Sequence, residues 1–271
     1  MCADVNEDGL VNVLDIISMV NYIMGGNPSP FDSEAADVNA DGGINVLDVI
    51  ALVNIIMQVP GMPCGCVAPV IYEGQTYATV LIGSQCWMAE NLNVGIMINS
   101  NASGSLQTDN NSIEKFCYEN TLSNCDTYGG LYEWNEAMEY LETEGVRGIC
   151  PYGWHIPTDG EWTELTTYLG GTTVAGGKMK STGTLELGTG LWYAPNTGAT
   201  NQSGFTGLPG GSREPAGSYF NGLHSDGFFW SSSRHFTNLV WYRGLGFNSA
   251  AMDRSDSTTG DDGFSVRCVR D

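Results

Sequence analysis

The chain carries a duplicated twelve-residue pattern near its amino end. Residues 4–15 read Asp-Val-Asn-Glu-Asp-Gly-Leu-Val-Asn-Val-Leu-Asp, and residues 37–48 read Asp-Val-Asn-Ala-Asp-Gly-Gly-Ile-Asn-Val-Leu-Asp. The copies lie 33 residues apart, and each is followed by an apolar run the length of a three-turn helix, residues 16–24 and 49–57. Gly25-Gly26 and Pro60 end these predicted helices. Because the runs are apolar almost all round, we expect the helices to be buried against each other or against a partner.

The spacing of oxygen-bearing residues in each copy predicts a calcium loop. Ca²⁺ takes six to eight oxygen ligands, and a twelve-residue loop places them at positions 1, 3, 5, 7, 9 and 12, with glycine at position 6 for the sharp turn. Both copies have aspartate at position 12, where an EF-hand has glutamate, so the helix start must lie closer to the ion. We expect two Ca²⁺ ions, held by Asp4, Asn6, Asp8, the Leu10 carbonyl, Asn12 and Asp15, and by Asp37, Asn39, Asp41, the Gly43 carbonyl, Asn45 and Asp48.

Charge is distributed very unevenly along the chain. Asp and Glu number 31 against 10 Lys and Arg, a formal net charge of −21, and no Lys or Arg precedes Lys115. Such a polyanion lacks the cations that bind phosphate backbones, which excludes nucleic acid and disfavours anionic membrane surfaces. Without cations the nine carboxylates of residues 1–66 would repel one another, so we expect this region to fold together with Ca²⁺ binding.

The cysteines favour an oxidising compartment. Their number is even and their spacing matches no paired Cys-x-x-Cys zinc pattern, so we expect four disulfides outside the cytosol, formed by Cys2, Cys64, Cys66, Cys86, Cys117, Cys125, Cys150 and Cys268. No run of 18 apolar residues is present, so we expect no membrane span. The sequence is polar and acidic from residue 3 and shows no signal peptide. We expect an extracellular or cell-surface protein, of which this is the processed chain or a piece of a longer one.

Residues 4–57 resemble a type I dockerin domain, on the strength of the two loop-and-helix repeats. The resemblance implies a small all-α domain that binds Ca²⁺ and docks onto a cohesin-like partner. In that family positions 10 and 11 of each loop contact the cohesin and are often Ser or Thr. Here they are Val13-Leu14 and Val46-Leu47. This departure implies a more apolar docking surface, unless the four residues face the domain's own core.

Residues 71–271 resemble the Fibrobacter succinogenes major paralogous domain. The resemblance rests on motifs in order along the chain: Ile82-Gly-Ser-Gln-Cys-Trp-Met-Ala-Glu-Asn-Leu92, Tyr128-Gly-Gly-Leu-Tyr-Glu-Trp134, Cys150-Pro-Tyr-Gly-Trp-His-Ile-Pro157, Trp230-Ser-Ser232 and Gly263-Phe-Ser-Val-Arg-Cys-Val-Arg270. It implies a loop-rich, C-type-lectin-like α+β domain of bacterial surface or secreted proteins. The whole chain is then α+β in class, with domains at 1–66 and 67–271.

Local patterns within the second region predict few regular elements. We expect a strand over 77–82, a helix over 159–169 capped by Thr158 or Asp159, and a final strand over 263–269. Residues 27–36, 95–112 and 170–222 are expected to be loops, and 58–69 a linker. We expect tryptophans to form the core of this domain, namely Trp87, Trp134, Trp154, Trp162, Trp230 and Trp241.

Disulfide connectivity does not follow from sequence alone, but the two domains suggest pairings. Either Cys2–Cys64 closes the first domain and Cys66–Cys86 links it onward, or the two partners are exchanged. Cys117 and Cys125 can close a small loop, and Cys150–Cys268 would tie an early segment to the last strand, as in many lectin-like domains.

No motif indicates catalysis. The nucleophile elbow, the zinc-protease helix and the P-loop are absent, and His155, His224 and His235 have no partner spacing. Glu214-Pro-Ala216 does not match the calcium-dependent sugar site of C-type lectins. We therefore expect a non-catalytic, extracellular, calcium-binding structural or adhesive protein whose dockerin-like region mediates assembly, including self-assembly into a surface filament. The alternative is a cellulosome-like component whose dockerin anchors a polysaccharide-binding domain, with glycans as ligands.

Overall fold

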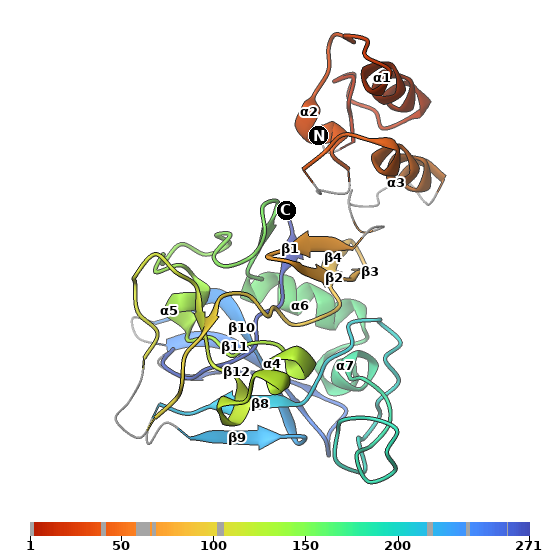
Figure 1. Ribbon diagram of the computed structural model, residues 1–271. Helices are drawn as coiled ribbons and strands as arrows, with labels where there is room; N and C mark the ends of the chain where they lie inside the picture. The colour runs from red at the N-terminus through yellow and green to blue at the C-terminus, as the bar shows by residue number, and fades with distance from the viewer. Residues whose placement is uncertain are drawn as a thin grey trace. The chain divides into compact units, whose positions relative to one another are not determined.

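The computed structural model describes residues 3–38, 42–57, 66, 69–101, 106–215, 219–236, 239–258 and 260–271, except for the side chains at 54, 57, 257 and 258. The chain divides into two compact units, Met1–Cys86 and Trp87–Asp271, and its class is α+β (Figure 1). In the described part of the chain, no helix has both the length and the apolar character needed to cross a bilayer.

The first unit begins with three helices, α1 (Val13–Ile23), α2 (Ser33–Ala36) and α3 (Val46–Met57). Helix α1 starts three residues before the apolar run because the Asn12 side chain caps it. That side chain accepts a hydrogen bond from the Leu14 amide, and the Asp15 carboxylate accepts one from the Asn12 amide, forming a capping box. The expected loop over 27–36 is wrong at 33–36, because Asp32 caps α2 by accepting from the Glu34 and Ala35 amides.

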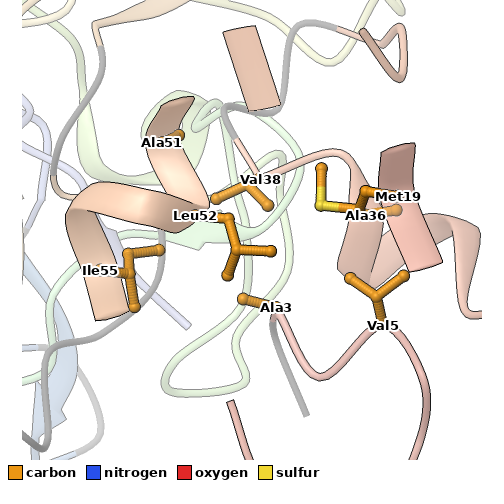
Figure 2. Packing of buried hydrophobic residues seen from close by; sticks show 8 residues of the cluster. All are labelled: Ala3, Val5, Met19, Ala36, Val38, Ala51, Leu52 and Ile55. Atoms are coloured by element: carbon orange, nitrogen blue, oxygen red, sulfur yellow. The ribbon is translucent and has the colours of Figure 1, made fainter. Parts of the chain in front are cut away.

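The two repeats share one small hydrophobic core (Figure 2). Equivalent positions of the duplication supply it, since Val5 corresponds to Val38 and Met19 to Leu52, and all four are fully buried. Helices α1 and α3 pack against each other around this cluster, which consists of Ala3, Val5, Met19, Ala36, Val38, Ala51, Leu52 and Ile55. Residues 3–57, as far as they are described, are called the head below.

Short strands complete the first unit. Strands β1 (Val70–Tyr72) and β2 (Gln75–Tyr77) form an antiparallel hairpin, and β3 (Thr79–Ile82) follows after a break at Ala78. The expected strand over 77–82 is therefore two elements. A disulfide joins Cys66 to Cys86. Cys2 and Cys64, the other half of this predicted pairing, lie outside the described residues.

The second unit, called the body below, is built on a five-stranded sheet of order β12-β11-β10-β8-β9 (Figure 1). The sequence did not predict its antiparallel strands. Strand β10 is buried along most of its length, including Ser231, Ser232 and Ser233 at 0–4% exposure, so it lacks the polar–apolar alternation of a half-exposed strand. The five strands are β8 (Gly210–Arg213), β9 (Phe220–Leu223), β10 (Asp226–His235), β11 (Leu239–Gly246) and β12 (Met252–Thr258).

Smaller elements surround this sheet. Strand β13 (Val269–Arg270) pairs with β4 (Gln85–Met88) and β7 (Trp154–His155), and β5 (Ile96–Met97) pairs with β6 (Glu114–Lys115). The expected final strand over 263–269 is mostly irregular, because residues 263–265 make only isolated bridges. The helical elements here are η1 (Tyr118–Asn120), α4 (Leu122–Tyr128), α5 (Trp134–Ala137), α6 (Asp159–Tyr168) and α7 (Thr172–Met179).

Helix α6 forms where the sequence predicted it, with Thr158 as the capping residue and Glu161 completing a capping box. Helix α7 was missed because the expected loop over 170–222 is rich in glycine. A Cβ at Gly176 would lie 2.0 Å from the Ala251 carbonyl oxygen, and one at Gly177 would lie 2.4 Å from that of Gly198. Glycine is therefore required inside this helix by close backbone packing rather than by a turn.

Two disulfides and a tryptophan core hold the body together. Cys117 pairs with Cys125 and Cys150 with Cys268, as expected from the sequence. Five of the six tryptophans expected in the core are fully buried, as is Trp192, which was not among them. Trp241 is the exception, because it is partly exposed between the His235 ring and the Arg254 guanidinium group.

We predict opposite effects for two glycine-to-alanine substitutions in neighbouring helices. Gly176→Ala should destabilise the protein by about 1–3 kcal/mol, because the added methyl group overpacks a backbone contact. Gly160→Ala in α6 should be stabilising by about 0.5–1 kcal/mol, because its Cβ meets nothing closer than 3.6 Å and alanine is the better helix former. Denaturant unfolding measures both, and a neutral Gly176→Ala would contradict the packing.

Candidate calcium loops and docking face

The first loop is folded around its own carboxylates. The Asp4 carboxylate accepts hydrogen bonds from the Asp8 and Gly9 amides, both at 3.0 Å. Gly9 has φ +85°, a left-handed conformation that glycine adopts without a steric penalty. The Asn6 and Asp8 side chains in turn accept from the amides of Asp8 and Leu10, at 3.1 and 2.9 Å. The turn therefore fixes the carboxylates and the amide oxygen of positions 1, 3 and 5.

Asp15 joins the two ends of this loop. Its carboxylate is fully buried and accepts from the amides of Val5, Asn6 and Asn12 at 2.7, 3.1 and 2.8 Å. A carboxylate has about four lone-pair positions, so the group retains capacity for a further partner. Because Asp15 also lies in the first turn of α1, the loop and the helix start are one structural unit.

The second loop repeats this frame. The Gly42 amide donates to Asp37 at 2.9 Å, and Gly42 has φ +85°, the same value as Gly9. The Asn45 amide donates to Asp48 at 2.9 Å, and Asp48 is fully buried like Asp15. The Gly43 carbonyl accepts from the Asn45 side-chain amide at 2.9 Å. Asn39 and Asp41, the remaining predicted ligands, lie outside the described residues.

The donor chemistry of the first loop fits Ca²⁺. All its predicted ligands are carboxylate, amide or carbonyl oxygens, the hard donors that this ion prefers. Over the described ranges, no three His, Cys, Asp or Glu side chains form a metal-binding group by themselves. An ion in this loop would therefore also need the Asn6 and Asn12 side chains and the Leu10 carbonyl.

Helices α1 and α3 each present an apolar patch to solvent. The patches occupy equivalent positions of the duplication, and their side chains are 50–61% exposed: Val13, Leu14 and Ile17 on α1, and Val46, Leu47 and Ile50 on α3. We call these six residues the docking face. The alternative that Val13-Leu14 and Val46-Leu47 face the core is wrong. The helices do pack against each other, and burial of these patches against a partner stays a prediction.

The comparisons with known proteins agree with this organisation. The family model described as the Fibrobacter succinogenes major domain matches residues 80–270. The chain belongs to this family. Residues 2–57 match the dockerin type I domain, so a type I dockerin precedes the family domain. Type I dockerin domains typically bind calcium.

Two similar solved structures each cover about a fifth of this chain. A crystal structure of an Arg-to-Asp variant of CaDoc0917 in complex with CaCohA2 at pH 5.5 is 36% identical, covering 21% of this chain and 95% of that one, with a TM-score of 0.21. A complex of CaCohA2 with a different Arg-to-Asp variant of CaDoc0917, at pH 8.0, is 38% identical, covering 21% of this chain and 98% of that one, with a TM-score of 0.20. A search of curated proteins found no match.

The motif residues of the family domain lie mainly in its core. The Arg267 guanidinium group is fully buried and donates to the Asn91 side chain and to the carbonyl oxygens of Met88, Phe205 and Thr206. Burial lowers the pKa of Arg267 to about 9. The motifs that identify the family thus specify packing rather than an exposed reactive group.

Lys180 is similarly committed to structure. It is fully buried, and its ammonium group donates to the carbonyl oxygens of Gly246 and Ser249, both at 2.8 Å. Burial lowers the pKa of Lys180 to about 8. The lowered pKa is therefore explained by burial of a structural lysine, whose hydrogen bonds connect the end of α7 to the turn after β11.

His155 is clamped between two carboxylates. Its Nε2 lies 2.8 Å from Glu161 and its Nδ1 lies 2.6 Å from Asp271, so both ring nitrogens face acceptors. Burial disfavours the charged ring, but the two carboxylates outweigh it and raise the pKa of His155. The same contact lowers the pKa of Glu161 against the effect of its burial.

We predict that His155→Gln destabilises the protein more at pH 6 than at pH 9. A raised folded-state pKa means that the stabilisation is complete below the unfolded value near 6.5 and is lost as the pH rises through the folded value. We expect His155→Gln to lower the free energy of unfolding by about 1–2 kcal/mol at pH 6. This loss is smaller than for a fully buried ion pair, because Asp271 is largely exposed. Thermal unfolding at the two pH values measures the difference. His224→Gln is the control, since its Nδ1 bonds a backbone carbonyl; equal losses at both pH values for His155→Gln would contradict the clamp.

Proposed function

We propose that this protein is a non-catalytic, calcium-binding assembly protein of the bacterial exterior or cell surface, whose head docks onto another protein chain. The observation that carries this proposal is the docking face, two equivalent apolar patches exposed on helices whose starts are fixed by the loop frame. Exposed apolar clusters of this kind mark interaction sites. The resemblance to dockerins makes a cohesin-like domain the expected partner.

Calcium links the loops to this face. We propose that two Ca²⁺ ions occupy the loops and neutralise carboxylates that no Lys or Arg of residues 1–114 can pair with. Asp15 and Asp48 belong to the first turns of α1 and α3, so an ion held there would also fix the helices that carry the docking face. Ion binding stabilises the folded state by mass action and should order the head.

The charge of the head sets the chemistry of the partner. Apolar patches on a head that has acidic residues and no Lys or Arg fit a surface that has an apolar centre and a rim of Lys or Arg. Two heads placed face to face would bring like charges together, which argues against a head-to-head dimer. All 10 Lys and Arg residues follow position 114, so the body of a second copy is the candidate for self-assembly, and such head-to-tail contacts would propagate as an open filament.

Two features support the absence of catalysis and the external location. The motif residues that identify the family, such as Arg267, are buried in the core of the body. His155 and His235 pair with carboxylates of the protein itself. The three disulfides Cys66–Cys86, Cys117–Cys125 and Cys150–Cys268 suit an oxidising environment.

We predict that binding to a partner requires at least one intact patch of the docking face. Because the patches are equivalent, Leu14→Asp or Leu47→Asp alone should weaken binding to recombinant cohesin domains by no more than about tenfold. The double variant should abolish binding, because both patches then carry a buried charge at the contact.

The matched control is Met24→Asp, which places the same charge on an 82% exposed side chain at the far end of α1. Titration calorimetry is performed with Ca²⁺ and with a chelator, and electron microscopy of the protein alone tests self-assembly. The proposal would be contradicted if the double variant still bound the partner, or if binding were unchanged when a chelator removes Ca²⁺. Filaments lost only in the double variant would identify a second copy as the partner.

A further inference from the structure

A cavity of about 290 Å³ opens on the body, remote in sequence from the calcium loops. One wall is the loop over residues 108–113, and the other is formed by Glu136, Glu139 and Tyr140, which lie at and just after the end of α5. Ligand sites in proteins begin at about 300 Å³, so this cavity has room for one small ring rather than an extended ligand.

The deepest group of this lining is fixed in place. Glu136 is 4% exposed, and its carboxylate accepts from the Glu114 amide at 2.6 Å and from the Tyr140 hydroxyl at 2.8 Å. Burial raises the pKa of Glu136, and the neighbouring carboxylates of Glu114 and Asp109 act in the same direction. The most buried group of the lining is thus held in place by donors of the protein itself, and its charge is disfavoured.

The rest of the lining combines polar and apolar surface. Thr108, Asn110 and Ser112 supply hydroxyl and amide groups, while Ile113 and the Tyr140 ring supply apolar surface. The Asn110 side-chain nitrogen already donates to Thr108 and Glu114, and its oxygen accepts from the Ser112 amide, so Asn110 can take a further hydrogen bond only as an acceptor. A sugar ring has the same division, with hydroxyl groups around its edge and C–H groups on its faces. Aromatic and hydroxyl-matching groups together are suited to such a ligand.

A metal ion fits this lining less well. The described parts of the chain contain no group of three carboxylate, imidazole or thiol side chains placed to hold a metal. Arg147 lies 3.1 Å from Glu139 and already balances its charge, and both oxygens of Glu136 accept protein donors. The Glu139 oxygens keep lone pairs that can accept from neutral hydroxyl groups. Carboxylates arranged in this way can accept single hydrogen bonds from hydroxyl groups without converging on one point.

We propose that this cavity binds a single neutral sugar ring, such as the terminal residue of a glycan, through hydrogen bonds to Asp109, Asn110 and Glu139 and through contact with the Tyr140 ring. The site lies in the body and uses none of the groups that hold Ca²⁺ or form the docking face. It therefore gives the body a ligand of its own, and it can fail or succeed independently of assembly by the head.

Saturation-transfer NMR on the full chain tests this proposal with the methyl glycosides of glucose, galactose, mannose and rhamnose. At least one should bind, and Asp109→Ala and Glu139→Gln should each weaken it by about tenfold, the equivalent of 1.4 kcal/mol. Asp253→Ala, which removes an exposed aspartate from strand β12, is the matched control and should bind like the parent.

Two further arms make the outcome decisive. Butylamine tests whether the cavity instead takes a cation, and the spectra are repeated with a chelator to separate the result from the calcium loops. The proposal is overturned if no glycoside binds, if binding is unchanged in both cavity variants, or if only the amine binds. Glycoside binding that persists in the Leu14→Asp, Leu47→Asp double variant would show that the cavity acts independently of the docking face.

Discussion

The hydrogen bonds from backbone amides to aspartate side chains in the two loops are the interactions on which the head depends. Asp15 alone accepts three such bonds, which connect the loop entry, the loop exit and the first turn of α1. The core behind these loops is small, and the first 114 residues contain 13 acidic residues and no base. Backbone dipoles can orient these carboxylates but cannot neutralise them, and this supports our proposal that divalent cations stabilise the head.

The body differs from the head in that it is rich in loops, and most of its helices and of its strands outside the five-stranded sheet are short. Large rings fill its interior, and buried cations act as crossbraces by donating to several backbone carbonyls at once. Arg267 lies 4.1 Å from the Phe205 ring while it bonds three carbonyl groups. The disulfide Cys150–Cys268 then fixes the segment that carries this arginine, over a separation of 118 residues.

Sequence reasoning was strongest where a residue's neighbours lie close along the chain. The two dockerin repeats, the Thr158 cap of α6 and the family motifs are local patterns, and each could be read without knowing the fold. It failed where distant contacts decide the structure. Strand β10 was missed because its buried serines break the alternation of polar and apolar residues. Helix α7 was missed because its glycines, which make room for the carbonyl groups of Ala251 and Gly198, made the sequence resemble a loop. The cavity was also not predicted, because its two walls are joined only by folding, and no sequence pattern in residues 108–113 indicates a ligand site.

The exposed state of the docking face connects these observations to function. A duplicated helix would normally turn Val13, Leu14 and Ile17 inward, but the inner face of α1 is occupied by Met19 and by the buried Asp15. Because Asp15, a predicted calcium ligand, lies on the buried side of the helix, Val13, Leu14 and Ile17 lie on the outside. The calcium loop and the docking face are therefore two consequences of one helix orientation.

Calorimetric titration of the intact, metal-free chain with Ca²⁺ is the most direct test of this account. Two ions should bind per chain. Asp8→Ala should reduce the number to one, whereas Glu7→Ala, which removes the same charge from the adjacent exposed position, should leave it at two. The absence of binding heat, or equal behaviour of the two variants, would contradict the central claim.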